Sequence, residues 1–345
     1  TKMKFELTNN DRKYLGLVSV QDNWELVQID DDLYLYFDGD TIVKSIIVND
    51  TLYVESELNQ KTEDRKFILP KTNKGKPKKL NHAAYRRLKR IGTYFHYTSN
   101  YDFGVEIANY TARKSFFNTF FEQIRINDYN KLRAWLDKFI KESTDKDLED
   151  ISNFSKEKRN RFEMKEGDFF RFKIGRNQFG FGRITFKSNP FHDVNNLIND
   201  INNDRNNEMG KTLVIKIYHL ISNQKNIDIE TLKTLPSFPS QYLVYNNFLY
   251  GEFEIIGNIK LNPNELDFPI SYSNDKVHGD ELKIYLQWGL IYFEEDRLKF
   301  DKFIKVKNPS ATHEYNMFVS NPFKHCISGY TLHLTKNVME KCIKE

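Results

Sequence analysis

Short hydrophobic runs alternate with polar turns over residues 14–69 of the chain. The turns are Asp30–Asp32, Asp38–Asp40 and Asn49–Asp50, and their residue types favour tight reversals of the backbone. Because the intervening runs are rich in β-branched and aromatic residues, the pattern predicts an antiparallel meander with strands at 24–29, 33–37, 41–48 and 51–54. The aspartates do not complete the pattern of a calcium-binding loop, so hairpin turns explain them better.

Residues 128–143 carry the clearest helical pattern, because apolar side chains recur there at helical spacing. Asn127 or Asp128 can cap the N-terminus of this helix. A stripe of tryptophan and phenylalanine usually belongs to a core, so we expect the helix to close a first domain. The apolar positions are Leu132, Trp135, Leu136, Phe139 and Ile140.

The 345 residues exceed the usual single-domain length of about 100 to 200, so two domains are expected. Residues 141–166 are rich in Lys, Glu and Asp and lack apolar periodicity, which predicts a charged linker or an exposed helix. We place the boundary near residue 155. The first domain, residues 1–150, then holds the meander, a basic segment and the closing helix, and the second spans residues 156–345.

The second domain opens with a predicted β-hairpin at Gly167–Ile184. Phe170, Phe172 and Ile174 alternate with basic residues, and residues 175–178 supply a turn. Gly180 and Gly182 fall on the face opposite Phe179 and Phe181, where glycine permits close approach of another backbone or a bend in a small barrel. A weak amphipathic helix at 191–201, strands at 213–221, 241–245, 251–259 and 283–293, and a final strand and helix at 330–343 are expected to follow.

These patterns together predict an α+β, β-rich chain. Each domain is expected to be a twisted antiparallel sheet or a small open barrel with a few peripheral helices. Short strands of this kind are compatible with a barrel or a sandwich, and the sequence does not choose between them.

The hairpin and three later segments together resemble the immunity protein 26 family of bacterial polymorphic-toxin loci. Those segments are Glu254–Gly257, Leu266–Ile270 and Tyr285–Gly289. The resemblance covers roughly residues 160–345 and implies a β-rich intracellular protein, encoded beside a toxin, that protects the producing cell by binding that toxin. It therefore implies a cytoplasmic toxin-neutralising protein that is not an enzyme and needs no cofactor.

Charge is unevenly placed along the chain, although Lys and Arg total 52 against 48 for Asp and Glu. Residues 61–90 contain 12 basic and 2 acidic residues. Such a segment suits the phosphates of a nucleic acid, an acidic protein surface, or simply solvent. The candidate phosphate-binding residues are Lys74, Lys76, Lys78, Lys79, Arg86, Arg87 and Arg90.

Acidic residues are concentrated between residues 267 and 301. Acidic surfaces on inhibitors complement the basic clefts of nucleases. A nuclease is therefore one toxin class that suits the chain. Trp288 would anchor such an interface if it were exposed, because an indole combines a large apolar area with a donor. The candidate partner-binding residues are Arg171, Arg176, Arg183, Asp275, Asp280, Glu281 and Trp288.

Motifs of known chemistry are mostly incomplete in this sequence. Gly210-Lys211-Thr212 resembles the end of a phosphate-binding loop, but Arg205 stands where that loop needs glycine. The two cysteines lack the spacing of a metal site and indicate a reducing compartment. No hydrophobic run is long enough for a membrane span, so no membrane partner is expected.

Histidine offers two catalytic alternatives. His192 stands beside Asp193, a carboxylate that could orient an imidazole as a general base. A second constellation could cleave RNA without a metal by acid and base transfer and phosphate stabilisation, if folding gathers its members. Its members are His82, Tyr85, Arg86, Arg87 and His96.

Overall fold

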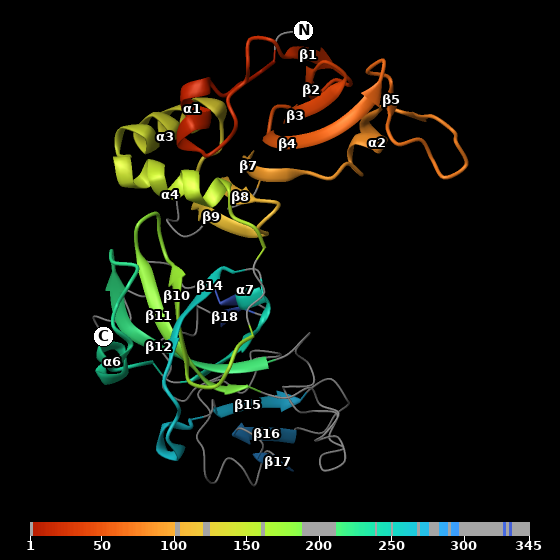
Figure 1. Cartoon of the computed structure of the whole chain (residues 1–345). Coiled ribbons are helices and arrows are strands. Elements are labelled where there is room, and N and C mark those ends of the chain that lie inside the picture. The colour runs from red at the N-terminus through yellow and green to blue at the C-terminus, as the bar shows by residue number, and fades with distance from the viewer. Residues whose placement is uncertain are drawn as a thin grey trace. The chain divides into compact units, whose positions relative to one another are not determined.

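The structure is a computed structural model whose chain divides into two compact units, Thr1–Arg161 and Phe162–Glu345 (Figure 1). Each unit has its own sheets and its own buried hydrophobic clusters. The described residues are 3–100, 104–119, 125–159, 163–187, 212–238, 240–249, 251–267, 270–275, 283–288, 291–296, 327–328 and 331–332.

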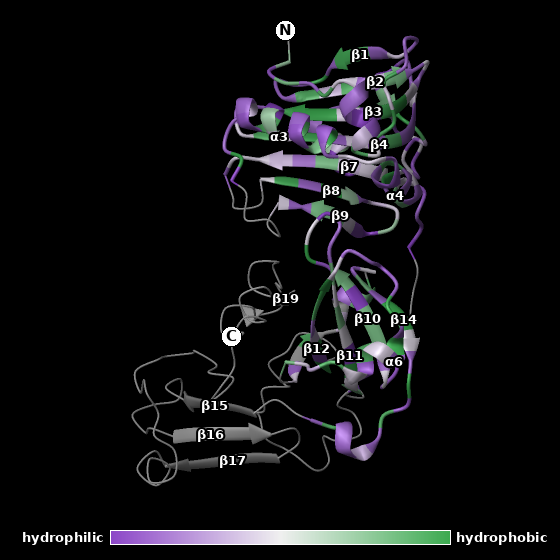
Figure 2. Ribbon diagram, turned by 90° about the vertical axis from the view of Figure 1, so that its left-hand side faces the viewer, coloured by the Kyte–Doolittle hydropathy of each residue, from purple (hydrophilic) through white to green (hydrophobic). Residues whose placement is uncertain are grey.

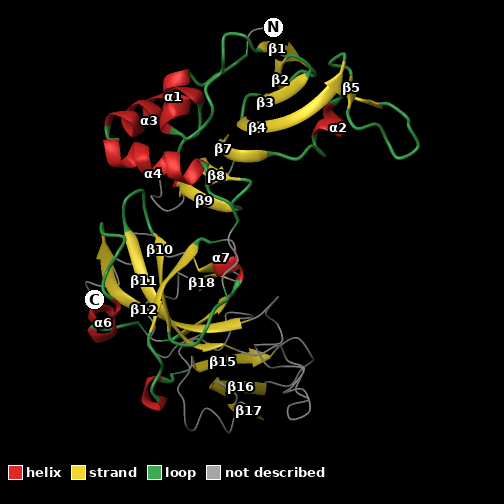
Figure 3. Ribbon diagram, viewed as in Figure 1, coloured by secondary structure: helices red, strands yellow, loops and turns green. Residues whose placement is uncertain are grey.

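An antiparallel sheet of nine strands forms the first unit (Figure 3). Its main order is β1-β2-β3-β4-β7-β8-β9, and β5 and β6 extend from the end of β4. The predicted meander is confirmed, and its fourth strand continues to Glu63. The bounds are β1 Glu25–Gln28, β2 Leu33–Asp38, β3 Thr41–Val48, β4 Leu52–Glu63, β5 Phe67–Ile68, β6 Lys78–Lys79, β7 Ile91–Thr98, β8 Val105–Asn109 and β9 Lys114–Asn118.

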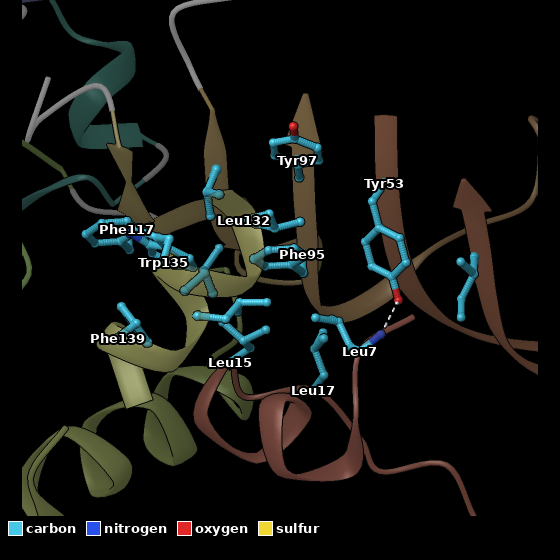
Figure 4. Packing of buried hydrophobic residues seen from close by; sticks show 14 of the residues in the cluster. Leu7, Leu15, Leu17, Tyr53, Phe95, Tyr97, Phe117, Leu132, Trp135 and Phe139 are labelled. Atoms are coloured by element: carbon cyan, nitrogen blue, oxygen red, sulfur yellow. Dashed lines mark hydrogen bonds between the residues drawn. The ribbon is translucent and has the colours of Figure 1, made fainter. Parts of the chain in front are cut away.

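Three helices, α1 (Asn9–Tyr14), α3 (Tyr129–Lys141) and α4 (Asp145–Ser155), pack on one face of this sheet (Figure 1). The predicted helix is confirmed as α3, and the Asp128 carboxylate accepts a hydrogen bond from the backbone of Lys131 at 2.8 Å. Figure 4 shows side chains of α3 meeting aromatic side chains of the strands.

The segment 145–155 differs from the charged linker or exposed helix that the sequence predicts. It forms α4, and Ile151 and Phe154 are buried in the same hydrophobic cluster as α3. Its three apolar residues, Leu148, Ile151 and Phe154, stand three positions apart, but so short a pattern among charged residues does not by itself distinguish a core helix from an exposed one.

The opposite face of the sheet is covered over β2, β3 and β4 by α2 (His82–Tyr85). This helix spans four residues. Because α2 contributes Ala84 and Tyr85 to a second cluster, β2 is buried on both faces. Tyr34 and Tyr36 lie in the cluster on the α3 side. Figure 2 shows hydrophilic positions interspersed with hydrophobic ones along the strands of this sheet.

Charged side chains are buried inside the α3 side of the first unit. Glu55 on β4 is 0% exposed and accepts hydrogen bonds from Arg12 Nε at 2.8 Å, from Tyr53 at 2.7 Å and from Lys44 Nζ. Tyr53 also accepts the backbone N–H of Leu7, as Figure 4 shows. Burial alone would raise the pKa of Glu55, but the charges of Lys44 and Arg12 outweigh burial and hold it below its usual value.

The second unit contains a five-stranded antiparallel sheet in the order β13-β12-β11-β10-β14. The predicted hairpin is confirmed as β10 and β11, and the strands expected at 213–221, 241–245 and 251–259 are confirmed as β12, β13 and β14. Hydrophobic clusters cover both faces. The bounds are β10 Asp168–Lys173, β11 Phe179–Lys187, β12 Thr212–Ser222, β13 Gln241–Val244, β14 Phe253–Asn258, with helices α6 Ile229–Thr234 and α7 Asn246–Leu249.

Smaller sheets follow in the same unit. The strands β15 (Ile270–Asp275), β16 (Lys283–Trp288) and β17 (Ile291–Asp296) form an antiparallel sheet, and β18 (Ile327–Ser328) pairs with β19 (Thr331–Leu332). The helix expected at 191–201 and the helix expected before 343 lie outside the described residues, as do His192 and Asp193.

The glycines of β11 receive phenylalanine rings from β10. Phe170 pairs with Gly182 and Phe172 pairs with Gly180 across the hairpin. A Cβ atom added at Gly182 would lie 2.4 Å from Phe170 Cζ and 2.6 Å from the Lys216 carbonyl oxygen. Glycine is thus needed because the facing ring fills the space that a side chain would take, in addition to the close backbone approach that the sequence suggests.

Candidate functional site

One end of the five-stranded sheet presents polar loops from three strands. The turn at residues 175–178 joins β10 to β11, and Phe179 pairs with Ser222, so the loop after β12 lies at the same end. Asn177 is exposed in the turn and Arg176 is half-buried there. The exposed residues of the second loop are Asn223, Gln224 and Asn226.

Arg171 fixes this second loop against the sheet. Its Nε and Nη2 donate to Glu254 Oε2 at 2.8 and 2.7 Å, which ties β10 to β14. Its Nη1 donates to the carbonyl oxygen of Lys225 at 2.9 Å and to Asn226 Oδ1 at 2.7 Å. Arg171 is therefore placed at the candidate surface as a positioning residue for the loop.

Arg183 is placed differently from the expectation that it contacts a partner. It is 3% exposed, its guanidinium carbon lies 4.7 Å from the centre of the Phe169 ring, and Nη2 donates to the carbonyl oxygen of Ile259 at 2.7 Å. It also pairs with Glu265. Because this guanidinium is enclosed, it holds the segment 259–265 on the sheet instead of meeting a partner.

The remaining candidate partner residues are only partly covered by the structure. Asp275 ends β15 and Trp288 ends β16, where Trp288 pairs with Ile270 through the backbone. Asp280 and Glu281 lie outside the described residues. A shared acidic surface on this segment therefore stays a prediction.

The basic segment of the first unit projects mostly into solvent. Its loop 70–77 joins β5 to β6, and seven basic side chains of the segment 71–90 are exposed. Lys78 is half-buried. Of the exposed set, Lys71 pairs with Glu63 at 3.2 Å. The exposed side chains are Lys71, Lys74, Lys76, Lys79, Arg86, Arg87 and Lys89.

Arg90 lies apart from this exposed group. Its guanidinium carbon lies 5.0 Å from the ring centre of Tyr85 and 5.9 Å from that of Tyr110. Tyr110 stacks on Tyr94 with their ring centres 4.2 Å apart. The aromatic contacts therefore lead from the end of the basic segment onto β7.

A carboxylate on β8 and an imidazole on β7 belong to one cross-strand pair. His96 on β7 pairs with Glu106 on β8, and Tyr94 donates a hydrogen bond to Glu106 Oε2 at 3.0 Å. Burial raises the pKa of Glu106, against the lowering effect of hydrogen bonds from Tyr94 and Ser115, and burial lowers the pKa of His96. Both side chains are half-buried.

The ribonuclease constellation predicted from the sequence is thus only partly gathered. Tyr85 is 1% exposed and its hydroxyl lies 2.9 Å from Ser45 Oγ, while His82 lies 4.0 Å from Asp32. Sequence reasoning missed Glu106. The sequence feature that points to this site is the alternation of Tyr94 and His96 with buried residues on β7. It does not identify Glu106, because the strand that pairs with β7 had to be known.

Among the described residues, no group of three His, Cys, Asp or Glu side chains is arranged to hold a metal ion. No helix in the described part of the chain has the length and apolar character needed to cross a bilayer.

Comparison with known proteins bears on the second unit. Neither a curated protein nor a solved structure matches the chain. The sequence model of one family, immunity protein 26, matches residues 165–281, which run from just before β10 to beyond β15. The resemblance is therefore confirmed over a shorter stretch than residues 160–345, and the segment Tyr285–Gly289 lies beyond the match. Residues 165–281 of this chain are thus similar to the immunity protein 26 family.

Proposed function

We propose that the chain neutralises a bacterial toxin by binding it through the second unit. The observation that carries this proposal is the immunity protein 26 match over residues 165–281, which includes the whole five-stranded sheet. An immunity protein acts by occupying its partner, so it needs an exposed and rigidly held surface rather than a reaction centre. The family thus favours a non-enzymatic role for this unit, in the cytoplasm of a bacterium.

We place the toxin contact at the end of the sheet that carries the 175–178 turn and the loop after β12. Polar side chains are exposed there, and Arg171 fixes the second loop through two acceptors of that loop, the Lys225 carbonyl oxygen and Asn226 Oδ1. A loop held before binding loses less conformational entropy when the partner arrives. Asp275, Asp280, Glu281 and Trp288 remain a second proposed contact, for a basic nuclease toxin.

Co-expression with a candidate toxin encoded near its gene tests the proposal. The full chain should restore growth to cells that produce the toxin, and the two purified proteins should elute as one complex. Toxicity that persists when the chain is abundant and folded would contradict neutralisation.

A matched pair of charge reversals tests the position of the contact. Arg176→Glu changes the turn at one end of β10, and Lys165→Glu makes the same change in charge near the other end, where Lys165 is exposed. We expect Arg176→Glu to weaken protection and Lys165→Glu to preserve it. Equal protection by both variants would remove this end of the sheet from the interface.

The first unit supports a second candidate function, binding of nucleic acid. The observation that favours it is the exposure of seven basic side chains between residues 71 and 90. Neutralising Lys76, Lys79, Arg86 and Arg87 together should weaken binding to RNA and flatten its dependence on salt, because each phosphate contact releases counterions. Binding that persists at high salt after these changes would count against this candidate. An acidic protein partner for the same surface is the alternative outcome.

A further inference from the structure

A row of polar and aromatic side chains crosses the first unit on the face that also carries α2. The cross-strand pairs place Val54 opposite His96 and Ser56 opposite Tyr94, whereas Glu55 on the α3 side faces Phe95. His96 and Tyr94 therefore lie on the α2 side. The row runs through side chains that contact or face one another in the order Arg90, Tyr110, Tyr94, Glu106 and His96.

The row has the ingredients of acid and base chemistry next to a phosphate. Directly opposed side chains in an antiparallel pair have Cβ atoms roughly 4.5–5.5 Å apart, so His96 and Glu106 can serve one reacting group. Tyr94 holds the Glu106 carboxylate at 3.0 Å. No cation forms an ion pair with Glu106 among the described residues, so its half-buried charge is not committed to a salt bridge.

Arg90 supplies positive charge at one end of this row. Its described neighbours are Tyr85 and Tyr110, and within the described part of the chain no carboxylate pairs with it. A half-buried guanidinium without a carboxylate is suited to an external anion, and arginine binds phosphate well through its planar set of donors. The exposed basic side chains of the segment 71–90 lead up to this position along the chain.

We propose that this face is a metal-independent site for RNA cleavage, at which Glu106 and His96 exchange protons with the ribose and the leaving oxygen. This inference rests on the second candidate function, binding of nucleic acid by the basic segment. It assigns a substrate class, RNA with a free 2′-hydroxyl, to a unit that lies before the family match.

The reaction balances without any further reagent. The Glu106 carboxylate takes the proton of the 2′-hydroxyl, and the 2′-oxygen forms a bond to phosphorus while the bond from phosphorus to the 5′-oxygen breaks. The imidazolium form of His96 gives its proton to that leaving oxygen. The products are a 2′,3′-cyclic phosphate and a 5′-hydroxyl, and exchange with water returns a proton to His96 and removes one from Glu106.

The surroundings of the pair favour these roles. Burial moves the pKa of Glu106 upward and that of His96 downward, so the two groups approach each other in proton affinity. Arg90, at the other end of the row, carries a fixed positive charge that can attract the phosphate backbone of the RNA to this face, since guanidinium remains protonated throughout. DNA lacks the 2′-hydroxyl and cannot follow this route.

The test uses the full chain, a single-stranded RNA labelled at its 5′ end, and DNA of the same sequence, all in excess chelator. We expect RNA to be cut with 2′,3′-cyclic phosphate ends and DNA to remain intact. Glu106→Gln and His96→Asn should each lower the rate by about 100-fold or more, the usual contribution of a general acid or base. Both should keep their affinity for RNA within about twofold, because the phosphate contacts of the basic segment are unchanged.

Glu149→Gln is the matched control, because Glu149 is an exposed acid on α4, a helix on the other face of the sheet. It should cleave at the normal rate. Cleavage that persists in both Glu106→Gln and His96→Asn would overturn the proposal and identify a contaminant. RNA binding without cleavage by the unaltered chain would overturn the reaction while leaving the basic segment as a binding surface. Absence of both binding and cleavage would overturn both functions of the first unit.

Folding of the variants is checked by thermal unfolding. If His96→Asn fails to fold, Glu106→Gln decides alone, because a neutral amide in place of a half-buried carboxylate does not add charge to the sheet face. The tests of RNA cleavage and of toxin neutralisation concern different units, so failure of one leaves the other standing.

Discussion

The cores of the two units are specified by different physical means. The first unit buries a charged cluster in which Glu55 meets Arg12, Lys44 and Tyr53, and the second unit fits phenylalanine rings over glycines. Removing one member of a buried ion pair leaves an uncompensated charge, whereas adding a methyl group to a packed ring contact produces overlap. The first core is therefore sensitive to charge and acid, and the second to volume.

Removing the carboxylate charge of Glu55 should have the largest effect on stability, and this effect should be confined to the first unit. Glu55→Gln leaves the buried Lys44 without its carboxylate and leaves Arg12 with Glu6 at 3.3 Å as its remaining partner, so the first unit should lose about 3–5 kcal/mol of unfolding free energy. Hydrogen exchange followed by mass spectrometry measures the two units separately. The control is Glu63→Gln, whose side chain is 44% exposed beside Lys71 and should change stability by less than about 1 kcal/mol. A similarly small effect of Glu55→Gln would show that the buried charged cluster does not determine the stability of the first unit.

Adding one methyl group should have the next largest effect, and it should fall on the second unit. Gly182→Ala places a Cβ against both the Phe170 ring and the Lys216 carbonyl oxygen, so we expect a loss of about 1–3 kcal/mol. Gly175→Ala is the control, because its nearest neighbour would lie at 3.8 Å. Both are measured by exchange of the β11 amides. If the two variants are equally stable, the tight packing of the Phe170 ring against Gly182 does not determine the stability of the second unit.

Acid should affect the first unit through Glu55. The folded pKa of this group lies below the unfolded value of 4.5, so its contribution is complete above pH 4.5 and is lost as the pH falls through the folded pKa. In a Trp288→Phe background the remaining tryptophans, Trp24 and Trp135, both lie in the first unit and report its unfolding in urea. We expect Glu55→Gln to lose less stability than its parent between pH 5 and pH 3. Parallel curves would contradict this account.

The smallest effect is expected at Glu106, and its sign is opposite to that at Glu55. Burial raises the pKa of Glu106, so the group contributes stability below pH 4.5 that is lost as the pH rises through the folded pKa. Glu106→Gln should therefore raise stability at pH 7 by about 0.5–1 kcal/mol, with the gain disappearing near pH 4. Thermal unfolding at the two pH values checks this. A loss at pH 7 would show that the carboxylate serves the fold.

The local elements were largely predictable from the sequence. Alternating patterns and turn residues located the meander and the β10–β11 hairpin, and the apolar spacing with its Asp128 cap located α3. These features depend on residues close together in the chain. The segment 145–155 was misjudged because its apolar pattern is only three residues long, Leu148, Ile151 and Phe154, and a packing partner was needed to recognise the last two as core.

Sites that depend on pairing between strands were not predictable. Glu106 is paired with His96 only by the register of β7 and β8, and nothing in its own sequence neighbourhood distinguishes it from a solvated acid. Arg183 shows the reverse error, since a basic residue on a hairpin gives no sign that Glu265, far along the chain, will enclose it. The resemblance to immunity protein 26 depends on local aromatic and glycine patterns, which explains why it was accessible from the sequence.

The Phe170–Gly182 and Phe172–Gly180 pairs also help to fix the register between β10 and β11. A slip of two residues between β10 and β11 would keep every side chain on its own face, so hydrophobicity alone would not prevent it. Such a slip would leave at least one of the two rings facing a side chain instead of a glycine. The two glycines therefore favour the native alignment of the hairpin over the nearest alternatives.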